Sequence, residues 1–394
     1  MPTLRQLFLN NVAQTSHFPQ MLEVERADGV YIYDREGKAY MDLIAGIGVS
    51  AVGHGHPKVI AAIKNQLGKY LHTMVYGEHI QSPQVRLAKK LTDQLPSRLN
   101  SVYFVNSGSE AVEGAMKLAK RYTGRYELVA CRNAYHGSTQ GANSLMSDQT
   151  FTRGYQPLLP GVKFMTFNNQ EDIAVITEKT AGVIVETVQG EAGVILPDEG
   201  YLRQLRQQCD ETGALLIFDE IQAGFGRTGH LFAFEKYGIV PDILLLAKGM
   251  GGGMPIGAFI ANRKVMDVLS HNPVLGHITT FGGHPVSCAA GIAALEVIND
   301  KRLLRQVVEK EALFHHLLHH EKVKEIRSAG LMMAVDLDDE KMVQDFCQKT
   351  HEMGLLTDWF LFNETSFRIA PPLTITTDEI KKASKIILKA LDDL

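Results

Sequence analysis

The amino-acid sequence predicts an α/β protein in which a mainly parallel central sheet forms a large domain beside a smaller α+β domain. Before about residue 290, strand-like and helix-like segments alternate, which is the pattern of a parallel sheet with crossover helices. The strand-like segments are short apolar runs, typical of strands that are buried on both faces. After residue 290, long charged amphipathic stretches replace them. We therefore expect a large domain over residues 49–289 and a discontinuous small domain made of residues 1–48 and 290–394.

The individual strands and helices follow from local patterns. A strand pair over residues 22–27 and 30–34 is expected to turn at Asp28-Gly29. The sheet of the large domain starts with a strand at 101–105, and a helix follows over 110–122, where apolar residues recur at helical spacing. Its other strands, all interpreted as buried parallel strands, are expected at 127–131, 182–186, 215–219, 242–247 and 256–261. The remaining elements are a helix over 200–213 that ends at Gly213, an amphipathic stretch over 301–325, and strands near 331–337 and 367–369.

The overall charge and composition exclude several classes of protein. Lys and Arg number 40 against 44 Asp and Glu, a net charge of −4, so neither nucleic acid nor a membrane surface is an expected partner. No apolar run reaches the roughly 18 residues of a membrane span, and the N-terminus does not resemble a signal peptide. Four scattered cysteines form no C-x-x-C pair, which argues against a disulfide framework and a thiolate zinc site. We expect a cytoplasmic protein without a bound metal.

Three of the expected strands end in groups that suggest a ligand site, since ligands of open α/β sheets bind outside the carboxyl ends of the strands. Asn106-Ser107-Gly108-Ser109 lies between a strand and a helix, where exposed N–H groups can cradle an anion; the alternative is a plain serine helix cap. Asp219-Glu220 directly follows an apolar strand and needs a partner. Lys248 ends another strand before four glycines in five residues. Burial there would favour a neutral, nucleophilic amine; the alternative is a lysine that caps the glycine turn.

Taken together, the three strand ends fit one ligand better than three. An anionic group on the first loop, a protonated ring nitrogen beside Asp219 and an aldehyde bonded to Lys248 would occupy all of them. Pyridoxal 5′-phosphate carries those three handles on one flat ring. The combination therefore predicts this cofactor, although none of the three features would do so alone.

Several long motifs occur along the chain in a fixed order. They are GHGHP (53–57), NSGSEAVEGAMKLAKRY (106–122), AYHG (134–137), ETVQGEAGV (186–194), LLIFDEIQAGFGRTG (215–229), DILLLAKGMGGGMPIGA (242–258), TTFGGHPVSCAAG (279–291) and FRIAPPL (367–373). With them, the chain resembles the class III pyridoxal-phosphate aminotransferases, in the branch of the acetylornithine and ornithine aminotransferases. The resemblance runs from about residue 15 to the C-terminus. It implies a fold-type-I homodimer with active sites at the subunit interface.

The resemblance also implies a role for each matching residue. Lys248 corresponds to the lysine that bonds to the cofactor and moves the proton between substrate and cofactor carbons, and Asp219 to the acid that keeps the ring nitrogen protonated. The other expected cofactor ligands are Ser107, Gly108 and Ser109 at the phosphate, Tyr135 stacked on the ring, His136, Gln222 at the ring hydroxyl, and Thr280 donated by the second subunit. The expected substrate ligands are Arg368, Glu191 and Thr279.

The expected substrate contacts include two departures from the branch. Arg368 matches the arginine that binds a carboxylate of the oxo acid, and Glu191 the glutamate that pairs with it when a substrate lacks a carboxylate there. However, Ser138 replaces an arginine that usually binds a substrate carboxylate, and Val49 replaces the tyrosine that contacts ornithine. These replacements disfavour strict ornithine specificity and leave the acceptor open.

Two further motifs have alternative interpretations. The segment 224–229 fits G-x-G-x-x-G, a dinucleotide-binding pattern, but it lies five residues after its strand, and the stretch that follows is too short for the usual helix. His315-His316 and His319-His320 have metal-ligand spacing, although a solvated helix face is the simpler interpretation.

The sequence therefore predicts an aminotransferase that moves a distal (ω) amino group from an acetylornithine- or ornithine-like donor to a 2-oxo acid such as 2-oxoglutarate, in two half-reactions. The alternatives are another class III ω-aminotransferase or a semialdehyde aminomutase. An NAD-dependent oxidoreductase and a non-catalytic ligand-binding module represent other classes.

Overall fold

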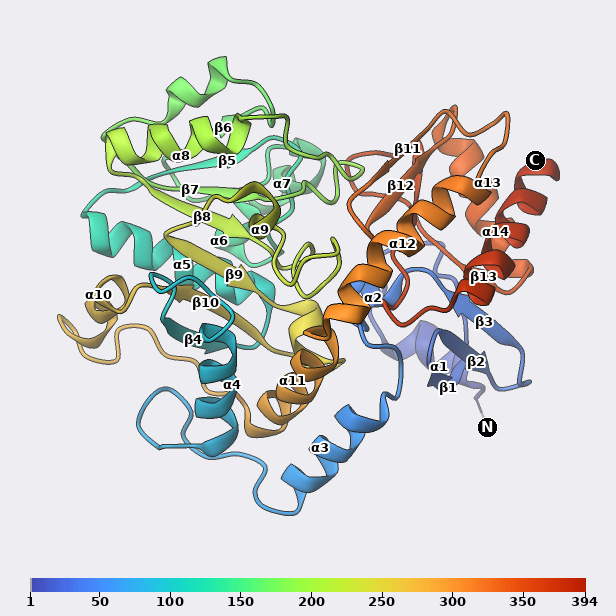
Figure 1. Cartoon of the computed structure of the whole chain (residues 1–394), viewed down its shortest axis with the longest axis horizontal. Helices are drawn as coiled ribbons and strands as arrows, with labels where there is room; N and C mark the ends of the chain where they lie inside the picture. The colour runs from blue at the N-terminus through green and yellow to red at the C-terminus, as the bar shows by residue number, and fades with distance from the viewer. Residues whose placement is uncertain (1) are drawn as a thin grey trace.

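A seven-stranded sheet forms the centre of the larger part of the molecule (Figure 1). The computed structural model describes residues 2–394. The strands, in spatial order, are β4 (Ser101–Val105), β10 (Gly257–Ala261), β9 (Ile243–Leu246), β8 (Leu215–Asp219), β7 (Thr180–Glu186), β5 (Glu127–Cys131) and β6 (Val162–Met165). The pairs from β9 through β8, β7 and β5 to β6 are parallel. The mainly parallel sheet expected from the sequence is therefore confirmed.

One strand runs against the prediction. The segment 256–261 was expected to be parallel, but β10 is antiparallel to both of its neighbours, β9 and β4. The chain between β9 and β10 contains only the short 3₁₀ turn η3 (Lys248–Gly251) and a few further residues. A parallel strand needs a crossover of a dozen or more residues. The chain therefore has to return in the opposite direction.

Helices cover both faces of the seven-stranded sheet, so its five inner strands are buried throughout, whereas the edge strands β4 and β6 are partly buried. On one face α5 (Gly108–Thr123) packs against Ile184 and Phe259, and on the other face α8 (Tyr201–Thr212) packs against Val183. Both helices match the predicted segments, and α8 ends at Gly213 in the left-handed conformation, as expected for a glycine cap. Gly114 brings α5 close to the sheet, because a Cβ atom there would lie 2.3 Å from the Phe259 ring.

Two smaller sheets lie beside the large one. The first, β1 (Val24–Asp28), β2 (Tyr31–Asp34), β3 (Ala39–Asp42) and β13 (Leu355–Leu356), contains the predicted antiparallel N-terminal pair. The second comprises β11 (Glu325–Ser328), β12 (Met333–Asp336) and β14 (Ser366–Ile369). Because β3 pairs with β13, the N-terminal strands and the C-terminal part share one sheet. The domain boundaries at residues 49 and 289 stay a prediction.

The remaining helices connect or flank these sheets (Figure 1). They are α1 (Leu4–Asn11), α2 (Ala45–Gly48), α3 (Pro57–Leu67), α4 (Ser82–Thr92), α6 (Gln140–Asn143), α7 (Gln149–Thr152), α9 (Phe234–Tyr237), α10 (Arg263–Met266), α11 (Pro285–Ile298), α12 (Lys301–Leu317), α13 (Glu340–Glu352) and α14 (Thr377–Asp392). Of the stretch 301–325, only the part up to Leu317 is helical. Within residues 2–394, no helix combines the length and the apolar character that a membrane crossing requires.

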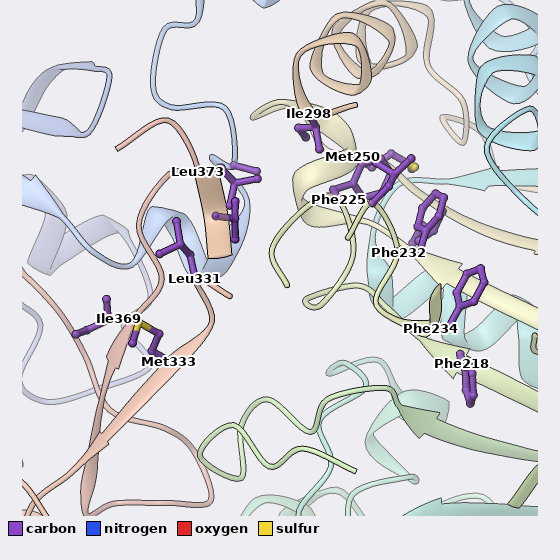
Figure 2. Close-up of a cluster of buried hydrophobic side chains, with 14 of the residues drawn as sticks. Phe218, Phe225, Phe232, Phe234, Met250, Ile298, Leu331, Met333, Ile369 and Leu373 are labelled. Atoms are coloured by element: carbon purple, nitrogen blue, oxygen red, sulfur yellow. The ribbon is translucent and has the colours of Figure 1, made fainter. Parts of the chain in front are cut away.

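The hydrophobic core continues from the large sheet to the smaller sheets. Figure 2 shows Phe218, Phe225 and Met250 on the side of the large sheet, and Met333 and Leu373 on the side of the smaller ones. All five belong to one cluster of buried side chains. This shared core holds the two parts of the molecule together at the end of the sheet where the polar groups described below gather.

The close packing of α5 on the sheet gives a stability prediction. We expect Gly114→Ala to lower the free energy of unfolding by up to about 2 kcal/mol, because the roughly 1–3 kcal/mol cost of overpacking a buried contact outweighs the roughly 1 kcal/mol that alanine gains in a helix. Denaturant unfolding measures this change. Gly154→Ala is the control, since a Cβ atom at Gly154 meets nothing within 4 Å. An equal effect of both substitutions would contradict the packing argument.

Candidate active site

A cavity of about 660 Å³ lies at the carboxyl ends of the parallel strands. Its walls come from the segments that follow β4, β5, β7, β8 and β9, as expected for an open α/β sheet. The lining residues are Val49, Asn106, Ser107, Gly108, Ser109, Tyr135, His136, Gly137, Ser138, Thr139, Glu186, Glu191, Asp219, Ile221, Gln222, Ala247, Lys248, Gly253, Met254, Pro255 and Ile256. Nine of the twelve predicted site residues therefore line the cavity, and the other three are Thr279, Thr280 and Arg368.

The start of α5 forms one wall of the cavity. Ser107 caps the helix by accepting the N–H of Glu110 at 3.2 Å, so it acts as the helix cap that was the plain alternative. The N–H groups of Gly108 and Ser109 in the first turn have no acceptor within the helix and lie at its positive end. A Cβ atom at Gly108 would lie 2.8 Å from Ile221. This end of α5 therefore combines a helix cap with free N–H groups that suit an anion.

Asp219 at the end of β8 is fixed from two directions. One carboxylate oxygen lies 2.7 Å from Nδ1 of His136, and the other accepts the backbone N–H of Ile221 at 3.0 Å. Although burial opposes it, the hydrogen bond and charge of Asp219 raise the pKa of His136 above its usual value. The sequence predicted a protonated ring nitrogen as the partner of Asp219, and the structure adds His136 as a second one, which the sequence analysis had assigned to the cofactor alone.

Glu186, at the end of β7, is a buried acid that the sequence analysis missed. It is the direct register partner of Asp219 across the parallel pair β7–β8 and also lines the cavity. Its Oε1 accepts the N–H of Gly190 at 3.1 Å, whereas its buried Oε2 has no hydrogen-bond partner among the described residues. Burial raises the pKa of Glu186 to about 8. The sequence signal for Glu186 was an acid at the end of the apolar run GVIVE, which is the same pattern that identified Asp219.

Lys248 follows β9 and extends into the same cavity. Its backbone has φ +45°, a left-handed conformation that is strained for a residue with a side chain. Burial lowers the pKa of its amine, although the nearby acids Glu191 and Asp219 oppose the shift. A lysine in these surroundings is more often a neutral nucleophile than an exposed lysine is.

Glu191 and Arg368 form a buried, bidentate ion pair. Nη1 and Nη2 of Arg368 each donate to a carboxylate oxygen of Glu191 at 3.0 Å. Burial opposes ionisation of Glu191, but Arg368 outweighs it and lowers the pKa of this carboxyl group. Asp358, which the sequence analysis also missed, accepts from Nε of Arg368 at 2.8 Å. Burial raises the pKa of Asp358 and Arg368 opposes this shift. The sequence signal for Asp358 was an isolated acid within the otherwise mainly apolar stretch 355–362.

Of the other predicted residues, some line the cavity and two lie outside it. Gln222 lines the cavity, and Gly190 makes room for its amide, since a Cβ atom there would lie 2.0 Å from Oε1 of Gln222. The hydroxyl groups of Tyr135 and Ser138 lie 3.0 Å apart at the cavity wall. Thr279 accepts from Asn106 at 3.0 Å, but neither Thr279 nor Thr280 lines the cavity of its own chain.

The two remaining motifs form other structures. The segment after the glycine motif 224–229 contains only the four-residue helix α9. Within that motif, Arg227 is buried and donates to the carbonyl of Leu331 at 3.0 Å, so it packs against the small sheets instead of holding a phosphate. His315 hydrogen-bonds Ser328 at 2.8 Å. No cluster of three or more His, Cys, Asp or Glu residues suited to a metal occurs in the part of the chain that the structure describes.

Comparisons with known proteins agree with this geometry. The fold and site define an α/β transferase, and the model of the family described as aminotransferase class-III matches residues 12–391. The chain belongs to the class III aminotransferases, and it is an enzyme of the transaminase type.

Similar proteins include curated enzymes and solved structures. The acetylornithine aminotransferase of Methanocaldococcus jannaschii is 40% identical over 93% of this chain and 91% of its own length. That of Methanopyrus kandleri is 40% identical over 95% of both chains. The ornithine aminotransferase of Toxoplasma gondii superposes with a TM-score of 0.91 at 30% identity, covering 100% of this chain and 96% of its own. A second structure of that enzyme, with a TM-score of 0.90 at 30% identity over 98% of this chain and 92% of its own, has pyridoxal phosphate at partial occupancy in its active site.

The buried acid at the end of β7 gives a prediction for stability against pH. With its pKa raised from 4.5 to about 8, Glu186 stays protonated in the folded protein where the unfolded chain has lost the proton. Its contribution to stability is thus complete at low pH and is lost as the pH rises through about 8. We expect the free energy of unfolding to fall less between pH 5 and pH 8 in Glu186→Gln than in the wild type.

Urea denaturation of the cofactor-free protein at a series of pH values measures this slope. The exposed Glu178 provides the control, because Glu178→Gln also removes one carboxylate and should keep the slope of the wild type. If Glu186→Gln keeps that slope too, Glu186 is ionised throughout the range and its assignment as a neutral acid is wrong.

Proposed function

We propose that the protein is a pyridoxal-phosphate-dependent aminotransferase that moves a distal amino group from an acetylornithine-like donor to a 2-oxo acid, with 2-oxoglutarate as the leading acceptor. One observation carries the proposal: the amine of Lys248 shares a cavity with Asp219 and with Glu191, the partner of Arg368. A nucleophilic amine, an acid for a ring nitrogen and a site for a carboxylate are what amino transfer requires.

The cavity residues fit pyridoxal phosphate at each of its polar groups. The free N–H groups of Gly108 and Ser109 suit the phosphate, and Gly137 allows its backbone close to Ser109, since a Cβ atom there would lie 2.3 Å from Oγ of Ser109. Asp219 suits a protonated ring nitrogen, Gln222 a ring hydroxyl and Lys248 an aldehyde. These contacts, with Ser107, His136 and a stacked Tyr135, are our assignments for this chain. The solved relative that carries this cofactor supports them.

When bound, the cofactor supplies an aldehyde that takes up the amino group and a ring that accepts electrons. The residues of this chain would then move the protons and hold the reacting groups in position. Nζ of Lys248, with its lowered pKa, would take the proton from the substrate carbon that carries the amine and return it later. Asp219, held by His136 and the N–H of Ile221, would keep a proton at the ring nitrogen. The buried walls would exclude water from these groups.

The Glu191–Arg368 pair supports the assignment of both substrates. While the pair is closed, the pocket presents no free cation at this point and suits a donor whose reacting end has no carboxylate. When the side chain of Glu191 moves away from Arg368, the guanidinium would bind the carboxylate of the oxo acid through two hydrogen bonds. Both curated relatives are acetylornithine aminotransferases, which supports the donor class.

A second candidate is a class III ω-aminotransferase or aminomutase with another substrate. Ser138 and Val49 favour it, because neither side chain at the cavity wall can replace the charged fork and the phenol that the ornithine branch uses. A panel of N-acetyl-L-ornithine, L-ornithine, putrescine and 4-aminobutyrate separates the two. The donor is the amine that removes the imine absorbance of the loaded protein at micromolar to millimolar concentration.

We also propose a homodimer with shared active sites. Thr280 is exposed and lies outside the cavity of its own chain, although its expected role is at the phosphate. The exposed apolar residues Val274, Leu275, Ile278 and Phe281 surround it in the sequence. A second copy that covers this segment would bury these side chains and bring Thr280 to the neighbouring cavity.

The first prediction tests the lysine. Borohydride should add a pyridoxyl group to the peptide that contains Lys248, and Lys248→Ala should remove that adduct and slow amino transfer by about 10²–10⁴-fold, as loss of a general base does. Mass spectrometry of the reduced, digested protein shows both results. Lys179→Ala, at an exposed position, should keep the adduct. An adduct that survives in Lys248→Ala would place the bond on another residue.

The second prediction tests the missing arginine. Ser138→Arg should lower the KM for 2-oxoglutarate by about tenfold, because a charge-assisted hydrogen bond to a carboxylate contributes about 1.5–3 kcal/mol. Ser138→Gln, which is similar in length but neutral, is the control. Steady-state kinetics with 2-oxoglutarate and pyruvate measure the effect. An unchanged kcat/KM for the dicarboxylate would show that position 138 does not face its distal carboxylate.

A further inference from the structure

Arg368 has several contacts besides its ion pair with Glu191. Its Nε donates to Asp358 at 2.8 Å and its Nη2 to the carbonyl of Trp359 at 3.3 Å. The guanidinium carbon lies 4.4 Å from the centre of the Phe360 ring. These three partners are consecutive in the chain, while Nη1 and Nη2 also donate to Glu191. Arg368 therefore has one edge that faces the segment 358–360 and one edge that faces the cavity side.

Asp358 is fixed to Arg368 through the backbone as well. The N–H of Arg368 donates to the carbonyl of Asp358 at 2.8 Å, and the next residues, Trp359 and Phe367, form an antiparallel bridge. Asp358 and Arg368 are thus neighbours on paired extended segments. Separating their side chains by more than a rotamer change would require breaking this backbone pairing.

Glu191 is attached differently. It lies in the turn after β7, lines the cavity and has Lys248 close enough to influence its charge. Apart from Arg368, the only group that donates to its carboxylate among the described residues is the N–H of Leu361, at 3.3 Å. One guanidinium thus faces two buried carboxylates, and only Glu191 of these two borders the cavity.

We propose that Asp358 is a positioning residue that keeps Arg368 in place while Glu191 exchanges with a carboxylate of the substrate. Without a second anchor, the arginine could follow Glu191 out of position, because a buried charge keeps its partner. With Asp358 accepting the hydrogen bond from Nε, the Nη edge stays aimed at the cavity side while Glu191 moves away. Asp358 thereby determines how well the pocket accepts carboxylates. This inference rests on the proposed function, since it concerns the exchange of substrates in that site.

The test uses the loaded enzyme and two types of substrate. Asp358→Ala should raise the KM for 2-oxoglutarate about tenfold or more, as expected for losing a charge-assisted hydrogen bond. The KM for an amine without a carboxylate, such as putrescine, should change less than about twofold, because Glu191 still holds Arg368 in that state. Asp358→Asn keeps an oxygen acceptor for Nε and should recover most of the loss. Glu364→Gln, an exposed acid of the same loop, is the matched control.

A binding measurement separates this inference from the proposed function. Calorimetric titration with glutarate, an unreactive dicarboxylate, should show affinity for the wild type, Asp358→Asn and Glu364→Gln, and about tenfold weaker affinity for Asp358→Ala. The inference is overturned if Asp358→Ala shifts both substrates equally, if Asp358→Asn is as impaired as Asp358→Ala, or if glutarate fails to bind the wild type. Binding of glutarate with the expected pattern but without amino transfer would sustain the inference and refute the proposed function.

Discussion

The parallel register of β7, β8 and β9 is the constraint on which the candidate site depends. It places Glu186 directly beside Asp219, and it places Leu245 beside Asp219 on the other side, three residues before Lys248. Two acids and an amine therefore reach the same edge of the sheet, each after a run of apolar strand residues. Glu186 and Asp219 are buried there, so each carboxyl group needs a partner within the cavity or a proton.

The three acids of the cavity are compensated in three different ways. Asp219 has His136 and a backbone N–H, Glu191 has the guanidinium of Arg368, and Glu186 has only the N–H of Gly190 and a raised pKa. Protonation is the remaining way to relieve a buried carboxylate that lacks a cation. The differences matter because one cavity then contains an acid hydrogen-bonded to a histidine, an acid paired with an arginine, and an acid whose pKa burial raises.

Much of the fold and part of the site could be predicted from the sequence, for physical reasons. Short apolar runs identify buried strands because both faces of such strands are covered, and they located β5, β7, β8 and β9. The same runs contain no information on the direction of a strand, so the prediction that β10 is parallel was wrong. The direction follows instead from the short connection between β9 and β10, which is too short for a parallel crossover. Thr280 shows a further limit, because a residue expected to act in another subunit cannot be tested within one chain.

The two acids that were missed illustrate the same limit for side chains. Glu186 ends an apolar strand just as Asp219 does, and only the register between their strands makes them neighbours. Asp358 is ten positions from Arg368 in the sequence, and only the pairing of their extended segments brings its carboxylate to Nε. A pattern along one segment can locate such an acid, but its partner is defined by the way in which two segments pair.

The arrangement of charge constrains the substrates that the cavity can hold. No arginine is among the residues that line it in the described part of the chain, and Arg368 becomes accessible only when Glu191 gives way. A substrate with one carboxylate can therefore be neutralised within a single chain. A dicarboxylate brings a second negative charge into a space that Glu186, Glu191 and Asp219 already border, and an unpaired buried carboxylate is costly. A second carboxylate in this cavity would therefore need to reach solvent or find a cation outside the lining residues.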